Sequence, residues 1–110
     1  MKIISTGIGV MNCYTVGKVK IVDDPIDAIG SCYGCIIVAK TPSPDITLII
    51  REAAGIITQS GGLTCHVALV CMEMGKPAIV GATDILSVVK DGMSIAMISS
   101  DKVGVVYAID

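Results

Sequence analysis

Residues 61–81 read GGLTCHVALVCMEMGKPAIVG and contain the single histidine of the chain, His66. An apolar run follows the two glycines, and no helix breaker interrupts residues 64–74. Gly75 comes directly after this run, and a proline follows two residues later, which is typical of a helix end. The stretch therefore predicts a helix over residues 64–74 and a short strand over residues 77–81.

His66 falls in the first turn of this predicted helix, where backbone N–H groups have no intrahelical partner. The aligned peptide dipoles add roughly half a positive charge at that end. Gly61 and Gly62 allow a sharp turn and the approach of a bulky group. Thr64 either caps the helix or donates its hydroxyl to an oxyanion. These features favour an anion beside a nucleophilic imidazole, and hence a histidine that accepts a phosphoryl group. The alternative is that His66 only caps the helix locally or pairs with a carboxylate.

Other short runs on both sides of this stretch predict the remaining elements. A helix is expected through about Ala53, capped by Ser43 or Asp45. Strands are expected at residues 17–22, 35–39, 54–58, 86–89 and 94–98, with a closing strand that ends near residue 109. The middle of the chain thus reads β-α-β-α-β, while both ends consist of strands and turns. We predict a mixed α/β domain with a parallel portion, an antiparallel portion and helices packed on one side.

Composition limits the class of protein. The chain has 110 residues, enough for one domain, and 53% of them are hydrophobic although Phe and Trp are absent. The net charge is −2 and the basic residues are dispersed, so a nucleic-acid surface is not expected. The apolar runs are far shorter than the roughly 18 residues of a membrane span, and no signal peptide is recognisable. The five cysteines are odd in number, which favours reduced thiols and a cytoplasmic location.

The stretch 61–81 resembles the signature of the phosphohistidine, or swivelling, domain of PEP-utilising enzymes. That family includes pyruvate phosphate dikinase, PEP synthase and enzyme I of the sugar phosphotransferase system. Its pattern runs roughly Gly-Gly-x-Thr-Ser-His-x-Ala, then an apolar helix, then Gly-x-Pro-Ala-Val-Val-Gly. The positions in register are Gly61, Gly62, Thr64, His66, Ala68, Gly75, Pro77, Ala78 and Gly81. The resemblance extends upstream to the Thr-Pro at residues 41–42 and covers about residues 17–109, which implies one swivelling domain over residues 1–110.

This resemblance implies a phosphoryl carrier. The family's histidine takes the group at a nucleotide site and delivers it at a PEP/pyruvate site, or the reverse, as the domain swivels. His66 is then the phosphorylated residue, and Gly61, Gly62, Thr64 and Cys65 stabilise the phosphate. This chain itself is expected to bind no cofactor, because it has no P-loop, ATP-grasp region or barrel. An ATP-grasp-like nucleotide-binding domain and a PEP/pyruvate barrel, with Mg²⁺ and ATP or PEP, are therefore expected on separate chains.

The sequence departs from the family pattern at three places. Cys65 replaces the serine before the histidine, and a thiol is a weaker hydrogen-bond donor. Met72 replaces an arginine six residues after the histidine. The family's opening Ser-Pro-Gly is replaced by VMNCYTVG over residues 10–17, which predicts an altered N-terminal strand and turn. These departures keep open an alternative, a non-catalytic regulatory or interaction module that retains the fold.

Two further clusters carry possible chemistry. Cys32 and Cys35 have the spacing of a redox or metal pair, but no second such pair exists and they precede a buried strand. We expect no metal or redox role for them. Asp23, Asp24 and Asp27 suggest either a cation site or a solvated acidic loop, and the loop is favoured.

The predicted helix after His66 is apolar on almost every side. Val67, Val70, Cys71 and Met74 form one stripe. Ala68, Leu69 and Met72 extend the apolar surface, leaving only Glu73 charged. This composition predicts a surface for a partner or for self-association.

Overall fold

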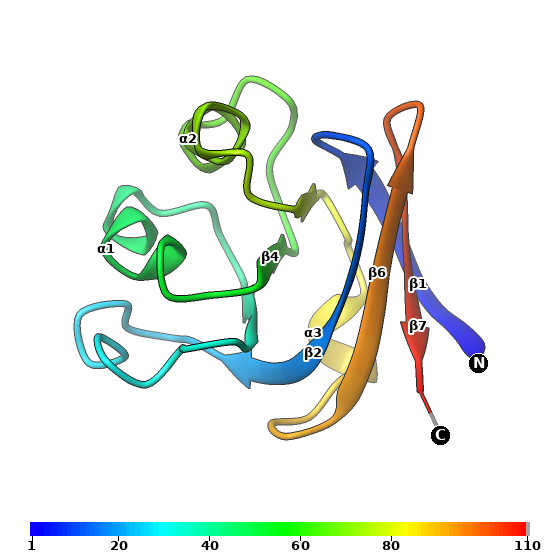
Figure 1. Cartoon of the computed structure of the whole chain (residues 1–110), viewed down its shortest axis with the longest axis horizontal. Coiled ribbons are helices and arrows are strands. Elements are labelled where there is room, and N and C mark those ends of the chain that lie inside the picture. The colour runs from blue at the N-terminus through cyan, green and yellow to red at the C-terminus, as the bar shows by residue number, and fades with distance from the viewer. Residues whose placement is uncertain (110) are drawn as a thin grey trace.

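The computed structural model describes residues 1–109 of the chain. The elements in chain order are β1 (Lys2–Gly9), β2 (Cys13–Ile21), β3 (Ile36–Ala39), the 3₁₀ turn η1 (Pro44–Ile46), α1 (Thr47–Ile50), β4 (Gly55–Thr58), α2 (His66–Met74), β5 (Ala78–Val80), α3 (Ile85–Val88), β6 (Ser94–Ser100) and β7 (Val103–Ala108). Helices α1 and α2 lie on one side, and β1, β6 and β7 lie on the other (Figure 1).

The seven strands close into a barrel in the order β1-β5-β4-β3-β2-β6-β7. Strands β2, β3, β4 and β5 pair in parallel, while β1, β6 and β7 pair antiparallel with their neighbours. The predicted combination of a parallel and an antiparallel portion is therefore confirmed. Every residue of β3, β4 and β5 is buried, because these strands have a helical layer on one face and the barrel interior on the other.

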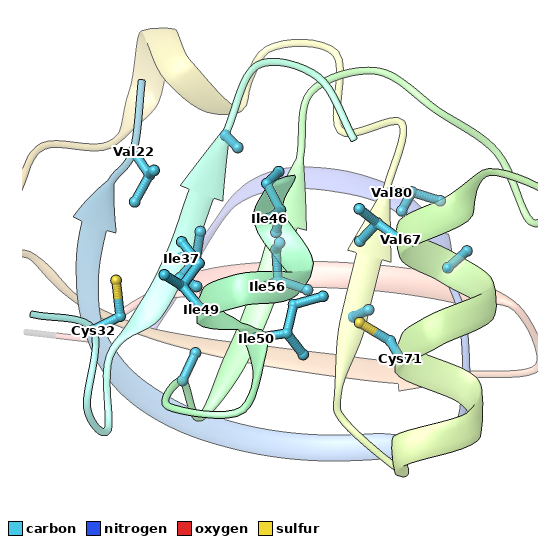
Figure 2. Close-up of a cluster of buried hydrophobic side chains, with 14 of the residues drawn as sticks. Val22, Cys32, Ile37, Ile46, Ile49, Ile50, Ile56, Val67, Cys71 and Val80 are labelled. Atoms are coloured by element: carbon cyan, nitrogen blue, oxygen red, sulfur yellow. The ribbon is translucent and has the colours of Figure 1, made fainter. Parts of the chain in front are cut away.

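Two apolar clusters hold the barrel together. In the first, which we call the helix layer, Ile37, Ile56 and Val80 of the sheet pack under α1 and α2 (Figure 2). The second fills the barrel interior, where Ile57 and Ile79 meet Met97 of the antiparallel strands. Alternate residues of each parallel strand enter one cluster or the other, as the period of two requires. Aliphatic side chains supply both cores, which agrees with the absence of Phe and Trp.

The structure corrects several predicted elements. The predicted strand over residues 86–89 is wrong, since this segment forms α3. Both edges of β6 are already paired, with β2 and β7, so no edge remains for a hairpin partner, and Ile85 instead enters the barrel interior. The helix expected through Ala53 is reduced to η1 and the single turn α1. The strand expected at residues 17–22 begins earlier, at Cys13, and β1 precedes it.

Within residues 1–109, no helix is long and apolar enough to cross a membrane.

Candidate functional site

His66 is the first residue of α2, which begins two residues later than the predicted start at residue 64. The preceding residue, Cys65, is the N-cap, with an extended backbone (φ −69°, ψ 158°) and no capping hydrogen bond from its side chain. The first helical bond runs from the N–H of Leu69 to the carbonyl of Cys65, over 3.1 Å. The N–H groups of the first turn therefore have no helical acceptor, and the exposed imidazole stands at their end of the helix.

The loop that carries His66 is tied to the neighbouring strand. Beyond the end of β4, the N–H of Gln59 donates to the carbonyl of Ala39 over 2.9 Å. Both the N–H and the hydroxyl of Ser60 donate to the carbonyl of Lys40 at 3.1 Å, and the Thr58 hydroxyl donates to the Ser60 carbonyl at 2.7 Å. These bonds continue the pairing of β3 with β4 past the sheet edge. The start of the loop is thus held in a fixed position.

The two glycines of the loop have different roles. Gly61 has a φ of +110°, and a Cβ there would lie 3.1 Å from Pro42 Cγ and 3.3 Å from Cys65 Sγ. On its other side, the Gly61 carbonyl approaches Gly81 so closely that a Cβ on Gly81 would lie 3.0 Å away. Gly61 is therefore required by the packing of three adjacent loops. A Cβ on Gly62 would meet nothing within 4 Å, so Gly62 borders open space.

The two residues before His66, Thr64 and Cys65, differ in their exposure to solvent. Thr64 is exposed and does not occupy the N-cap, so of the two roles considered for it the structure rules out capping of α2. The reason is that the helix begins two residues later than expected. Cys65 is only half-buried, and its side chain packs against the helix layer and close to Gly61. Thr64 and His66 are thus exposed and Gly62 borders open space, while the Cys65 thiol packs toward the core.

The rest of α2 anchors the site. Val67, Ala68 and Cys71 are buried in the helix layer, and burial raises the pKa of the Cys71 thiol to about 11. Met74, which the sequence places in one apolar stripe with Val67, Val70 and Cys71, is 39% exposed. Met74 is the last residue of α2, next to the C-cap glycine Gly75 at φ +67°. Leu69 and Met72 are also exposed.

The other predicted clusters lie away from α2. Cys32 is buried and its pKa is raised by burial, while its N–H donates to the Glu52 carboxylate at 3.2 Å. In the part of the chain that the structure describes, no three His, Cys, Asp or Glu side chains are grouped to hold a metal. Asp24 accepts a hydrogen bond from the N–H of Ile26, as an acidic turn residue does.

Sequence reasoning missed one hollow at the same edge of the sheet. The loops that follow β2 and β3 enclose a hollow of about 420 Å³. The walls of this hollow include Asp24, Lys40, Thr41 and Asp45. Pro42, between the lining residues Thr41 and Ser43, lies close to the His66 loop, since a Cβ on Gly61 would lie 3.1 Å from Pro42 Cγ. No local pattern marks this feature, because it needs two loops that are distant in sequence.

Residues 33–102 of this chain match the family described as PEP-utilising enzyme, mobile domain. The chain belongs to this family. The mobile domain is 37% identical to a probable phosphoenolpyruvate synthase of Archaeoglobus fulgidus over 96% of its own length. It spans 14% of the length of that relative, so the relative contains much more than a mobile domain. His66 and its glycine loop lie inside the matched range.

Solved structures share the architecture of this mobile domain. Aconitase X of Thermococcus kodakaraensis aligns with a TM-score of 0.72 and 18% identity, covering 96% of this chain and 98% of that chain. An NMR structure of Enzyme I aligns with a TM-score of 0.60 and 23% identity, covering 73% of this chain and 33% of that chain. At such identities the likeness shows the fold alone. Because differently named proteins share this fold, the chemistry has to be argued from the site.

Proposed function

We propose that this mobile domain is a phosphoryl carrier and that His66 holds the group during transfer. The observation that carries the proposal is the position of the imidazole. It is exposed at the N-terminal end of α2, on a loop that hydrogen bonds fix to β3. Family membership adds that the matched domains are described as parts of PEP-utilising enzymes.

The reaction at His66 is a displacement at phosphorus. The unprotonated ring nitrogen attacks the phosphorus of the donor, the bond from phosphorus to the donor oxygen breaks, and its electron pair leaves with that oxygen. The N–H groups of Val67 and Ala68 and the positive end of the helix dipole then face the phosphoryl oxygens. Positioning and electrostatics are the contribution of this domain, because no acid or base on α2 lies in the first turn beside the imidazole.

We propose that Gly61, Gly62, Thr64 and Cys65 contribute to phosphate binding in different ways. Thr64 is exposed two residues before His66, and Gly62 borders open space, so both are accessible to a phosphoryl group. Gly61 acts indirectly, by allowing the loop conformation. Cys65 packs against the helix layer and contributes its backbone rather than its thiol.

The donor and acceptor sites belong outside residues 1–109. We propose an ATP-grasp-like nucleotide-binding domain and a PEP/pyruvate barrel domain, which bind Mg²⁺ with ATP or PEP. The length of the phosphoenolpyruvate synthase relatives, of which this domain spans 14%, leaves room for both. The phosphoryl group moves from the nucleotide-binding domain to the barrel domain when ATP is the donor, and in the opposite direction when PEP is the donor.

A small donor tests the carrier role without any partner. We expect phosphoramidate at neutral pH to phosphorylate the chain and release ammonia, giving a product that is labile in acid and stable in base. ³¹P NMR then shows which ring nitrogen carries the group. The label disappears in His66→Ala and persists in Leu69→Ala, a matched control one turn further along α2.

A second arm tests transfer. Labelled PEP is added with a phosphoenolpyruvate synthase whose own mobile-domain histidine has been replaced, and label on this chain supports carriage. Absence of label in both arms, with folding intact, refutes the carrier role and leaves the regulatory or interaction module.

A further inference from the structure

Thr58, the last residue of β4, is the only polar residue in the strands β3, β4 and β5. Every other residue of these strands is aliphatic or glycine, and Thr58 itself has no exposed surface. A buried hydroxyl without a partner is unfavourable, and the Thr58 hydroxyl donates to the Ser60 carbonyl at 2.7 Å. A position where packing alone favours an apolar side chain thus holds a hydroxyl that is bonded to the start of the His66 loop.

The bond from Thr58 is the best protected of the bonds that hold Ser60. The N–H and the hydroxyl of Ser60 both donate to the Lys40 carbonyl at 3.1 Å, but Ser60 and Lys40 are exposed, so water competes for these groups. The donor of the third bond is the fully buried Thr58. Removal of the Thr58 hydroxyl therefore leaves Ser60 held only by bonds that water can replace.

The backbone of Thr58 holds a second loop beside the first. The Thr58 carbonyl accepts a hydrogen bond from the N–H of Ala82 at 3.0 Å, which fixes the loop after β5. In that loop, Gly81 lies so close to the Gly61 carbonyl that a Cβ on Gly81 would be 3.0 Å from it. Through its hydroxyl and its carbonyl, Thr58 thus determines where two loops meet beside Gly61.

The chain between Ser60 and His66 has little freedom to absorb a displacement. Gly61 takes a φ of +110° in close packing, and the N–H of Cys65 donates to the Gly62 carbonyl at 3.1 Å, which closes a turn. His66 follows as the first residue of α2. A shift of Ser60 therefore reaches the first turn of α2 instead of being lost in a flexible segment.

We infer that Thr58 is a positioning residue for phosphoryl transfer at His66. The Thr58 hydroxyl is buried and does not touch the transferred group; it fixes the loop so that the imidazole and the N–H groups of the first turn face the same phosphorus. Misplacement of a reacting group by about 1 Å lowers a rate by about a hundredfold. This inference rests on the proposed carrier function.

Thr58→Val tests the inference, because valine keeps the shape of threonine and removes the donor. We expect the rate of labelling by phosphoramidate to fall at least about tenfold, measured well below the Tm of the variant. Thr58→Ser restores the hydroxyl and is expected to recover most of the rate. Circular dichroism first establishes that each variant is folded, and Thr58→Ala replaces Thr58→Val if the latter unfolds.

Ile56→Val is the matched control for lost stability. Ile56 is buried in the helix layer on the same face of β4, two residues before Thr58, and makes no contact that holds the loop through a hydrogen bond of its side chain. This variant is expected to lower Tm and to leave the labelling rate within about twofold of the unsubstituted chain. Amide hydrogen exchange at Gln59 and Ser60 is expected to accelerate in Thr58→Val and not in Ile56→Val.

The outcomes separate this inference from the proposed function. Equal labelling rates of Thr58→Val and the unsubstituted chain overturn the inference and leave the carrier role intact. Equal slowing in Ile56→Val overturns it as well, since lost stability would then explain the effect. A Thr58→Ser rate as low as that of Thr58→Val also overturns it, because the methyl group rather than the hydroxyl would be responsible. No label on the folded, unsubstituted chain overturns both.

Discussion

Replacing Gly61 by alanine is expected to destabilise the domain and to displace His66. The φ of +110° is unfavourable for any residue with a Cβ and costs about 1–3 kcal/mol. The added Cβ also lies 3.1 Å from Pro42 Cγ and 3.3 Å from Cys65 Sγ, so both side chains have to shift by a few tenths of an ångström. We expect a loss of about 2 kcal/mol, which lowers Tm by about 8–16 °C in a domain of this size.

Differential scanning calorimetry and urea unfolding measure this loss, and the neighbouring glycine provides the control. A Cβ on Gly62 meets nothing within 4 Å, so Gly62→Ala is expected to leave Tm unchanged or slightly higher. The rate of labelling by phosphoramidate is expected to fall in Gly61→Ala even at temperatures where the variant is folded, because the loop before His66 has moved. Equal Tm values for the two alanine variants would refute the assignment of Gly61 as the conformationally restricted position.

Three further predictions concern the site and the core. Cys65→Ser supplies a hydroxyl that accepts a hydrogen bond from the first turn of α2, so urea unfolding is expected to show a gain of up to about 1 kcal/mol; a loss would show that thiol packing matters more. Burial raises the pKa of the Cys71 thiol to about 11 in the folded chain, against 9.0 when unperturbed. The contribution of this thiol to the free energy of unfolding is therefore fully present below pH 9 and is lost as the pH rises through 11, because the unfolded chain releases the proton first. The total loss is at most about 3 kcal/mol. Urea unfolding measured between pH 9 and 11 is expected to show a shallower decline of the free energy of unfolding with pH in Cys71→Ala than in the unsubstituted chain. Identical slopes for the two proteins would contradict this. Gly104→Ala places a Cβ within 2.7–2.9 Å of three atoms of the buried Ile79 side chain and is expected to cost about 1–3 kcal/mol, measured by thermal unfolding; an unchanged Tm would show that Ile79 repacks freely.

Local signals account for the part of the fold that was predicted correctly. The end of α2 at Met74 follows from Gly75, which takes the left-handed conformation at φ +67° as C-cap glycines do. The position of His66 in the first helical turn follows from the same short stretch. The buried strands β3 and β4 were recognisable because residues covered on both faces are uniformly apolar.

Features that depend on distant pairing were not predictable from neighbouring residues. Residues 86–89 have the composition of a strand, yet β6 has no free edge, and whether an edge is free depends on strands far along the chain. The different roles of Gly61 and Gly62 depend on the position of Pro42 in another loop, because a Cβ on Gly61 would lie 3.1 Å from Pro42 Cγ.

The sequence by itself determined the family, the order of the central elements and the place of His66 in the first turn of a helix, since each of these depends on a few adjacent side chains. Only the tertiary structure decided that the strands close into a barrel, because closure requires β1 to pair with β7 from the opposite end of the chain. The pairing of β3, β4 and β5 also brought Lys40 and Gly81 beside the loop that carries His66, an arrangement that no single segment of the sequence contains.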